Sequence, residues 1–440
     1  MAAPWRPGPT VRQLTWHDSR HEAVDGEAGS CVRQWHCSRA PRRVNRRPAG
    51  LGRHRTLPLV CWPNLEHAFS VPKIALLLCV DILLAVDYWT RRNRSGGVAW
   101  PVLAWTAAVA VSALLSPQAS LEGLLVALAP APLFWAGSGE CLPPNVLAGA
   151  VGAGSAVASV VAVLQYAGAD PLAWLGWRAG AFSSARMRVY GTLGNPDFVA
   201  AWCCAALPLS YFGLVERARG KRAAALGWAA VALQCAAIFA TRSRAALLAL
   251  AFEAMALAVC RRRAWNRWMA LLAAAAVLAL LPGARPLGET IRGRLYLARV
   301  SLSQPRQIPL AGCGPGCFET QYARWQVEWL RTHASSDARF AGPVDHAHND
   351  YLEFLVEYGV PGLCVLIVLC WRMAAGAWRL RLSPDASFRG AAAGSIAGLL
   401  ALACVDFPLH RPAESVLFWL CAGALIHGNS GGEPGSGPER

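Results

Sequence analysis

The sequence is poor in charged residues, and acidic residues are the scarcest of them. Only 15% of its 440 residues are charged and 55% are hydrophobic, while Asp and Glu number 26 against 42 Lys and Arg. The apolar residues form blocks such as 146–167 and do not alternate with polar ones. Missing alternation excludes a membrane barrel, and blocks of this length are not expected of a soluble domain. The composition predicts an all-α bundle of transmembrane helices.

Cysteine and glycine motifs of common binding sites are absent. The 15 cysteines include no CxxC pair and no Cys/His finger spacing, and most lie in apolar blocks, where cysteine behaves as a small hydrophobic residue. Residues 312–316 are glycine-rich but lack the lysine of a nucleotide-binding loop, so they predict a tight turn with close backbone approach instead of ATP binding. Cys313 and Cys317 lie in a predicted external loop, where a disulfide could form.

Eleven apolar segments are predicted to span the membrane, with a length near the ~20 residues that cross the hydrocarbon core. They are 74–90, 98–116, 121–137, 146–167, 198–214, 223–240, 245–260, 268–281, 356–373, 390–405 and 413–427. Arginine-rich connectors then fall on one side, which the positive-inside rule makes cytoplasmic. This distribution explains the net charge of +16 without nucleic-acid binding.

The predicted domain covers residues 57–427 and includes an external loop at 282–355, with an interfacial helix at 291–302. Residues 1–56 contain no apolar run that could be a signal peptide or a span, and 428–440 are rich in Gly, Ser and Pro. Both tails are predicted to be disordered. An odd number of spans places the Arg-rich first tail outside, against the charge rule. Either this tail is an exported extension, or a first helix is missing because the reading frame starts at the wrong place; the second is favoured.

A polar cluster at 345–353 lies at the external mouth of the span that begins near Val356. Neutral imidazole can take a proton from a sugar hydroxyl near pH 7. His348 and His346 are therefore candidate catalytic bases, with Asn349 and Asp350 in support. Two alternatives stay open: these side chains cap the helix, or the two histidines bind zinc. A third zinc ligand is not evident, so no metal is predicted.

Arginines provide a second signal on the same side of the membrane. Arg188 precedes one span, Arg244 opens another, and Arg294 lies on the predicted interfacial helix. Guanidinium groups bind diphosphate through paired hydrogen bonds. The alternative is that each arginine reaches to lipid head groups, but their convergence with the histidines favours a shared anion site. Asp406 ends the penultimate span and is a candidate supporting residue of either a functional or an interfacial kind.

Four segments together resemble the O-antigen ligase and polymerase superfamily. They are 188–196 with Asn195, 243–244, 309–318 with Gly314 and Gly316, and 346–362. Their order matches the family, the resemblance covers roughly 70–427, and no single motif would suffice. Residues 69–73 resemble the link between the family's first two helices, which agrees with a missing first helix. Asp197 departs from the Asn often found in the family, and its charge weakens the assignment of Arg188 to phosphate.

The resemblance implies a membrane glycosyltransferase of the bacterial inner membrane, with its active site facing the periplasm. Its donor would be a glycan on undecaprenyl diphosphate, and its acceptor a hydroxyl of a glycan or of lipid A-core, as in polysaccharide and lipopolysaccharide biosynthesis. His348 or His346 would be the base, and Arg188, Arg244 and Arg294 would hold the diphosphate, without metal or other cofactor. Ligation, polymerisation and transfer to protein stay open.

The competing hypothesis is a transporter of a lipid-linked sugar or a small anion. Transporters place ionisable residues near mid-membrane, often in repeated halves. Here Asp81, Asp87 and Glu253 are scattered exceptions in otherwise uncharged spans, and no internal repeat is found. The polar groups gather at one face, which favours the enzyme.

Overall fold

The computed structural model describes residues 61, 69–91, 100–139, 142–177, 189–260, 287–303, 309–333, 336–380 and 387–427. These residues form helices and no strand, which confirms the all-α class for the described part of the chain. All of these described residues belong to one compact unit. The predicted tails at 1–56 and 428–440, the predicted span at 268–281 and Arg188 lie outside the described residues.

Helices lie at ten of the eleven predicted spans. These helices are α1 (Val71–Arg91), α2 (Trp100–Leu115), α3 (Leu121–Leu128) followed by α4 (Leu133–Ser138), α5 (Pro144–Tyr166), α7 (Pro196–Ser210) continued by η3 (Tyr211–Glu216), α8 (Lys221–Thr241), α9 (Arg244–Cys260), α13 (Asp350–Arg379), α14 (Ser387–Ala403) and α15 (Pro412–His427). The connectors contain α6 (Pro171–Trp174), α11 (Leu287–Leu302), α12 (Phe318–Thr332), η5 (Ser336–Phe340) and η7 (Pro408–His410).

Many of these helices turn apolar side chains outward. On α8, for example, Leu226 and Trp228 are exposed although the helix carries few polar residues. A helix that is apolar all round and not buried in protein is suited to lipid. Among the described residues, five helical stretches are long and apolar enough to cross a membrane, and three shorter helices are apolar. These features indicate a multi-pass membrane protein.

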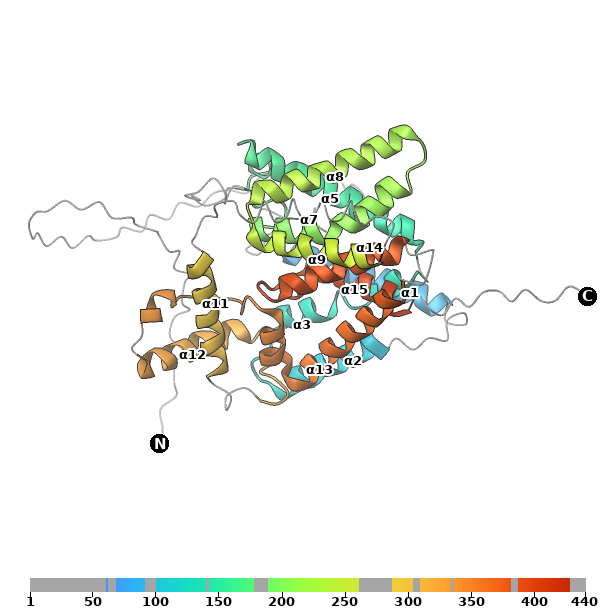
Figure 1. Ribbon diagram of the computed structural model, residues 1–440. Coiled ribbons are helices and arrows are strands. Elements are labelled where there is room, and N and C mark those ends of the chain that lie inside the picture. Colours follow the sequence, from blue (N-terminus) through green and yellow to red (C-terminus); the bar gives the residue numbers. More distant parts are fainter. Residues whose placement is uncertain are drawn as a thin grey trace, which may run out of the picture. The chain divides into compact units, whose positions relative to one another are not determined.

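Helices α9 and α14 pack closely side by side, as Figure 1 shows. A Cβ added to Gly398 would lie 2.2 Å from the Glu253 carboxylate, and one added to Gly394 would lie 3.0 Å from Leu257. Residue numbers increase along α9, from Glu253 to Leu257, where they decrease along α14, from Gly398 to Gly394. The two helices are therefore antiparallel. The start of α9 at Arg244 therefore lies at the same end of the bundle as the end of α14.

Helix α13 is broken at Gly359, whose φ of 65° and ψ of −163° are not helical. The glycine-rich loop docks at this break: Cys313 N–H donates to the Val356 carbonyl over 2.9 Å, and Val360 N–H donates to the Leu310 carbonyl over 3.0 Å. A Cβ on Gly312 would lie 2.2 Å from the Glu357 carbonyl. The predicted close backbone approach of this loop is confirmed.

Gly314 and Gly316 meet the connector between α2 and α3 on the other side of the same loop. Both have positive φ values, of 100° and 71°. A Cβ at these positions would lie 3.0 Å from Ala119 and 2.2 Å from the Ser120 hydroxyl, respectively. Only glycine combines this backbone with this lack of space. These two glycines allow the loop to pack between the α2–α3 connector and α13.

A second, smaller core joins α11 and α12 to the start of α13 (Figure 1). Its buried members include Tyr296, Phe318, Trp325, Ala347 and Val356. Helix α11 contains the predicted helix 291–302. Because Ala347 and Val356 belong to this core, the layer of α11 and α12 fixes the segment that carries the two candidate histidines.

Cys313 and Cys317 form a disulfide within the docked loop. Replacing both with serine should lower the free energy of unfolding by about 2 kcal/mol, the chain-entropy value for so short a loop. The measurement is thermal unfolding of the purified protein in detergent, with and without reductant. The Cys79→Ser variant is the control, since Cys79 is exposed and not disulfide-bonded. Equal melting of the double variant and the control would show that the bond does not stabilise the fold.

Candidate active site

The segment from His346 to Asn349 is held by hydrogen bonds between backbone N–H groups and side chains. Ala347 is buried and donates its N–H to Glu353 Oε2 over 2.8 Å. The Asn349 side chain caps α13 by accepting the Leu352 N–H over 2.9 Å. Between them His348 has a φ of 50°, a left-handed conformation that is strained for a non-glycine residue. The helix cap proposed from the sequence is therefore formed by Asn349, and the histidines remain available for other contacts.

His346 forms the tighter of the two histidine pairs. Its Nδ1 lies 2.6 Å from Glu353 Oε1, and its ring stacks on Phe407 with 4.0 Å between centroids. Burial alone would lower the pKa of His346, but the Glu353 carboxylate outweighs this and raises the pKa above its usual value. About a third of the side chain, 32%, is exposed. With Nδ1 held by a carboxylate, Nε2 is left as the atom that can exchange a proton with a substrate.

His348 faces Asp406 at the end of α14. Its Nδ1 lies 3.6 Å from Asp406 Oδ1, and 42% of its side chain is exposed. Burial would raise the pKa of Asp406, but Arg411 and His348 hold it well below its usual range. The Arg411 guanidinium donates to Asp406 Oδ2 over 3.0 Å. Asp406 is thus a fixed anion beside His348.

Arg411 is itself buried and doubly paired. Besides Asp406, it approaches Glu414 with 3.2 Å between Nε and Oε1. Its guanidinium lies over the rings of Phe198 on α7 and Phe407, at 4.2 Å and 5.1 Å from their centroids. These stacked contacts tie the start of α7 to the loop between α14 and α15. Phe407 contacts His346, His348 and Arg411, so one aromatic ring connects both histidines with the arginine.

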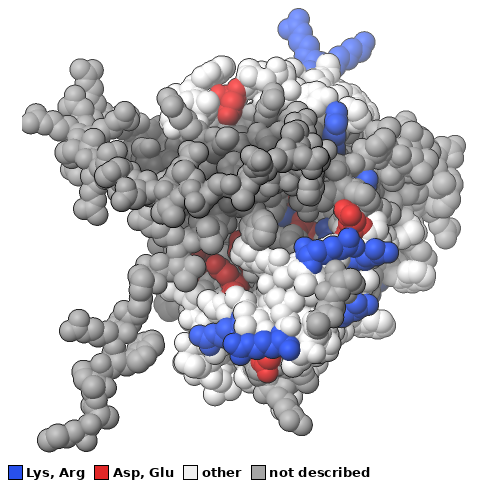
Figure 2. Space-filling model, turned by 90° about the vertical axis from the view of Figure 1, so that its left-hand side faces the viewer, with Lys and Arg blue, Asp and Glu red and all other residues white. Residues whose placement is uncertain are grey.

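Arg294 on α11 lies within electrostatic reach of the same region. Burial lowers the pKa of Arg294, and the attraction of Asp406 and Asp197 opposes this shift. Electrostatic attraction thus links Arg294 to Asp406, the anion that His348 faces. Figure 2 shows acidic and basic side chains together in a hollow of the face it displays.

Three further predicted site residues are Asn195, Arg244 and Arg188. Asn195 caps α7 by accepting the Asp197 N–H over 2.9 Å, three residues before Phe198, so it positions the helix that carries the aromatic contact. Arg244 opens α9 at the end of the bundle to which Asp406 also belongs. Arg188 lies outside the described residues, so its predicted place is untested.

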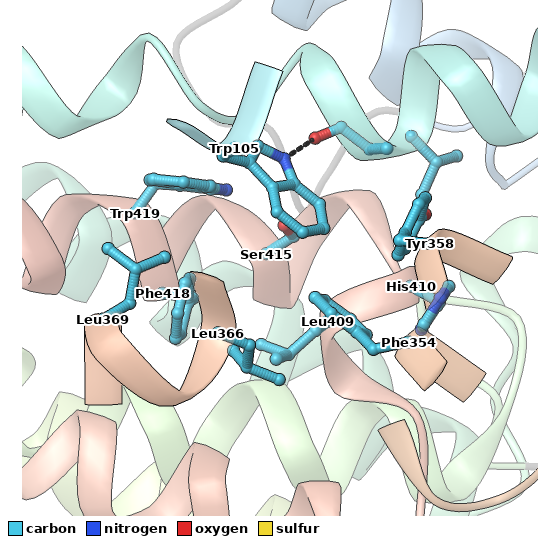
Figure 3. A pocket seen from close by; sticks show the side chains of 12 residues that line it. Trp105, Phe354, Tyr358, Leu366, Leu369, Leu409, His410, Ser415, Phe418 and Trp419 are labelled. Atoms are coloured by element: carbon cyan, nitrogen blue, oxygen red, sulfur yellow. Dashed lines mark hydrogen bonds between the residues drawn. The ribbon is translucent and has the colours of Figure 1, made fainter. Parts of the chain in front are cut away.

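A buried charged layer lies behind the histidines. His410 on η7 has Nδ1 2.6 Å from Asp350 Oδ1, and its Nε2 faces Glu357 Oε2 at 3.5 Å and Glu353 Oε1 at 3.9 Å. Burial would lower the pKa of His410, but Glu353, Asp350 and Glu357 raise it well above its usual value. Figure 3 shows His410 beside Phe354 and Tyr358 at one edge of an apolar pocket that Trp105 also lines.

Sequence reasoning named Asp350 but missed Glu353, Glu357, His410 and Arg411 as site residues. A signal was present: the acids at 350, 353 and 357 follow helical spacing and so share one face of α13. Glu353 was missed because the helix was predicted to begin near Val356, whereas it begins at Asp350.

Glu353, Glu357 and His410 also present ligand-type atoms within 4.8 Å of one another. His346 is not a member of this group, and neither is His348, so the zinc alternative drawn from the His-x-His spacing is not supported among the described residues. Glu353 already accepts from His346 and Ala347, and His410 Nδ1 is taken by Asp350. The same atoms form a network of hydrogen bonds and ion pairs, in which His410 Nε2 faces Glu353 and Glu357.

Residues 229–367 match the family model described as O-antigen ligase. This segment is similar to the O-antigen ligase family, and the match confirms the resemblance drawn from the motifs over these residues. Of the described helices, it covers most of α8, then α9, α11, α12 and η5, and the first part of α13. The matched segment contains His346, His348 and Glu353, and the match supports glycan transfer of the ligase or polymerase type. No curated protein matches the chain.

Proposed function

We propose that this protein transfers a glycan from undecaprenyl diphosphate to an acceptor hydroxyl on the periplasmic face of the bacterial inner membrane. The observation that carries the proposal is the His346–Glu353 pair inside the segment that matches the O-antigen ligases. A carboxylate on Nδ1 fixes the imidazole and favours uptake of a proton at Nε2. The nearby Arg294, with Arg188 and Arg244 as further candidates, suits an anionic leaving group.

In the proposed reaction, the acceptor hydroxyl oxygen attacks the anomeric carbon of the donor glycan. The bond between that carbon and the diphosphate oxygen breaks, and the electron pair leaves with undecaprenyl diphosphate. His346 takes the hydroxyl proton, and Glu353 stabilises the imidazolium that results. His348, beside Asp406, orients the acceptor, and the arginines stabilise the charge that develops on the diphosphate. None of these steps requires a metal.

The test offers the purified protein a glycan on undecaprenyl diphosphate together with lipid A-core and glycan acceptors. Mass spectrometry then detects the transferred glycan and identifies the acceptor, and a parallel reaction contains a chelator. We expect a new glycosidic product in both reactions. Transport of the intact donor across proteoliposomes without any product would favour the transporter and would exclude the proposed reaction.

A further inference from the structure

His410 lies next to three buried acidic side chains of α13. It is 7% exposed, and three carboxylates from one face of α13 surround it. Asp350, Glu353 and Glu357 are themselves buried, at 0%, 0% and 2% exposure. Burying like charges together is costly unless an opposite charge compensates them. The imidazole is the group placed among all three.

The orientation of His410 is fixed on both sides of its ring. Asp350 binds Nδ1 with one oxygen and accepts the Leu409 N–H with the other over 2.9 Å. The ring is parallel to Tyr358 at 6.2 Å and meets Phe354 edge-on at 5.2 Å. Figure 3 shows these two aromatic side chains next to His410. Nε2 is therefore directed at Glu353 and Glu357.

Glu353 links this buried layer to the exposed one. Its Oε1 is 2.6 Å from His346 Nδ1 and 3.9 Å from His410 Nε2, while its Oε2 accepts the Ala347 N–H. Glu357 faces the same His410 Nε2, and its Oε1 accepts the Phe318 N–H at the start of α12 over 3.3 Å. A continuous chain of polar contacts thus runs from α12 through Glu357, His410 and Glu353 to His346.

The balance of buried charges determines which of these side chains carry a proton. With His410 neutral, only His346 and Arg411 would compensate the three buried carboxylates, and burial would favour uptake of a proton by one of them. Glu353 is the one whose loss of charge would reach the surface, because it is the partner of His346. With His410 protonated, two imidazolium groups and Arg411 face Asp350, Glu353, Glu357, Asp406 and Glu414.

We propose that His410 is a positioning residue: a buried imidazolium that keeps the Glu353 carboxylate ionised and directed at His346. The inference rests on the proposed function, since it assigns His346 as the base. His410 touches no reacting atom. It acts through Glu353, and Asp350 serves it by holding Nδ1.

The experiment compares His410→Gln with wild type in glycan transfer, using undecaprenyl-diphosphate glycan as donor. We expect turnover to fall by about 10- to 100-fold, the loss typical of removing an outer group that orients a functional side chain, while the donor KM changes little. The His333→Gln variant is the matched control, because His333 is exposed and directly follows α12. It should behave as wild type.

The pH profile separates positioning from a structural role. If Glu353 loses its charge, the rising limb of kcat/KM should move to lower pH in His410→Gln, as in Glu353→Gln. The double variant His410→Gln, Glu353→Gln should then lose little more turnover than Glu353→Gln alone, since both changes remove the same Glu353 charge beside His346. Reduced turnover with an unmoved limb would mean a structural role only. A shift of the limb to higher pH would mean that His410 acts on His346 only through repulsion between two positive charges. Either result overturns the proposal.

Further measurements test the proposal where His410→Gln does not fold, where a metal takes part, or where wild type makes no product. Should His410→Gln not fold, Asp350→Asn must move the same limb downward, since it releases Nδ1; an unmoved limb there also overturns the proposal. If chelation abolishes wild-type transfer and a divalent cation restores it, His410 Nε2 is a metal ligand and the proposal is wrong. If wild type makes no product, the proposed function fails. The His346 titration, followed by NMR of labelled histidine in wild type and His410→Gln, then still tests the positioning effect.

Discussion

Replacing His346 with alanine should lower turnover by roughly 10²–10⁴, the range expected for a lost acid-base group. The reason is geometric: His346 is held by Glu353 at 2.6 Å, and it is partly exposed. Donor binding should survive, because the imidazole contacts the acceptor proton and not the diphosphate. Initial rates at saturating donor, together with the donor KM, provide the measurement.

His348→Ala distinguishes the two histidines. The sequence leaves His348 and His346 as equal candidates, but His348 is 3.6 Å from its carboxylate and more exposed. We therefore expect a rise in acceptor KM with a smaller loss of turnover. The reverse pattern, with His348→Ala abolishing turnover and His346→Ala raising only KM, would exchange the two roles.

The pKa of His346 gives this prediction a pH dependence. A general base must be neutral, so kcat/KM should rise with pH through the raised pKa of His346. Glu353→Gln removes the cause and should shift the limb downward. The same pairing stabilises the folded state fully below the unfolded histidine pKa of ~6.5, and this contribution is lost as pH rises through the higher folded value. Activity and stability should therefore change in opposite directions in that range.

The sequence predicts the helices well because membrane burial is a local property. Each apolar block of about 20 residues predicts a span with no knowledge of its neighbours, and helices are found wherever such blocks are described. The break at Gly359 is not predictable in this way. It depends on the backbone of Leu310, which approaches from 49 residues earlier in the chain.

The site shows the same division between local and distant information. His346, His348 and Asp406 stand out because polar residues beside apolar blocks are unusual. His410 and Arg411 do not, because their importance lies in pairing with Asp350 and Asp406, and the first pair is separated by 60 residues. A single sequence shows which residues are polar, whereas the fold determines which of them form ion pairs with one another.

Replacing Arg294 with alanine should raise the donor KM and lower turnover, with a combined loss in kcat/KM of about 10- to 100-fold. This corresponds to losing hydrogen bonds to a charged group, worth about 1.5–3 kcal/mol. Diphosphate is already charged when the donor binds and gains charge as it leaves, so both parameters should change. Arg294→Lys should recover only part of the loss, since lysine keeps the charge but not the two-pronged geometry.

Arg292 provides the matched control on the same helix. It is exposed, two residues from Arg294, and carries the same charge, so Arg292→Ala tests whether α11 acts only through general attraction to anionic lipid. Donor binding to both variants should be measured at two salt concentrations, because screening weakens exposed charges more than partly buried ones. Equal losses in the two variants, both removed by salt, would assign Arg294 to the lipid surface. A loss confined to Arg294→Ala and resistant to salt is the result that a diphosphate site beside Asp406 requires.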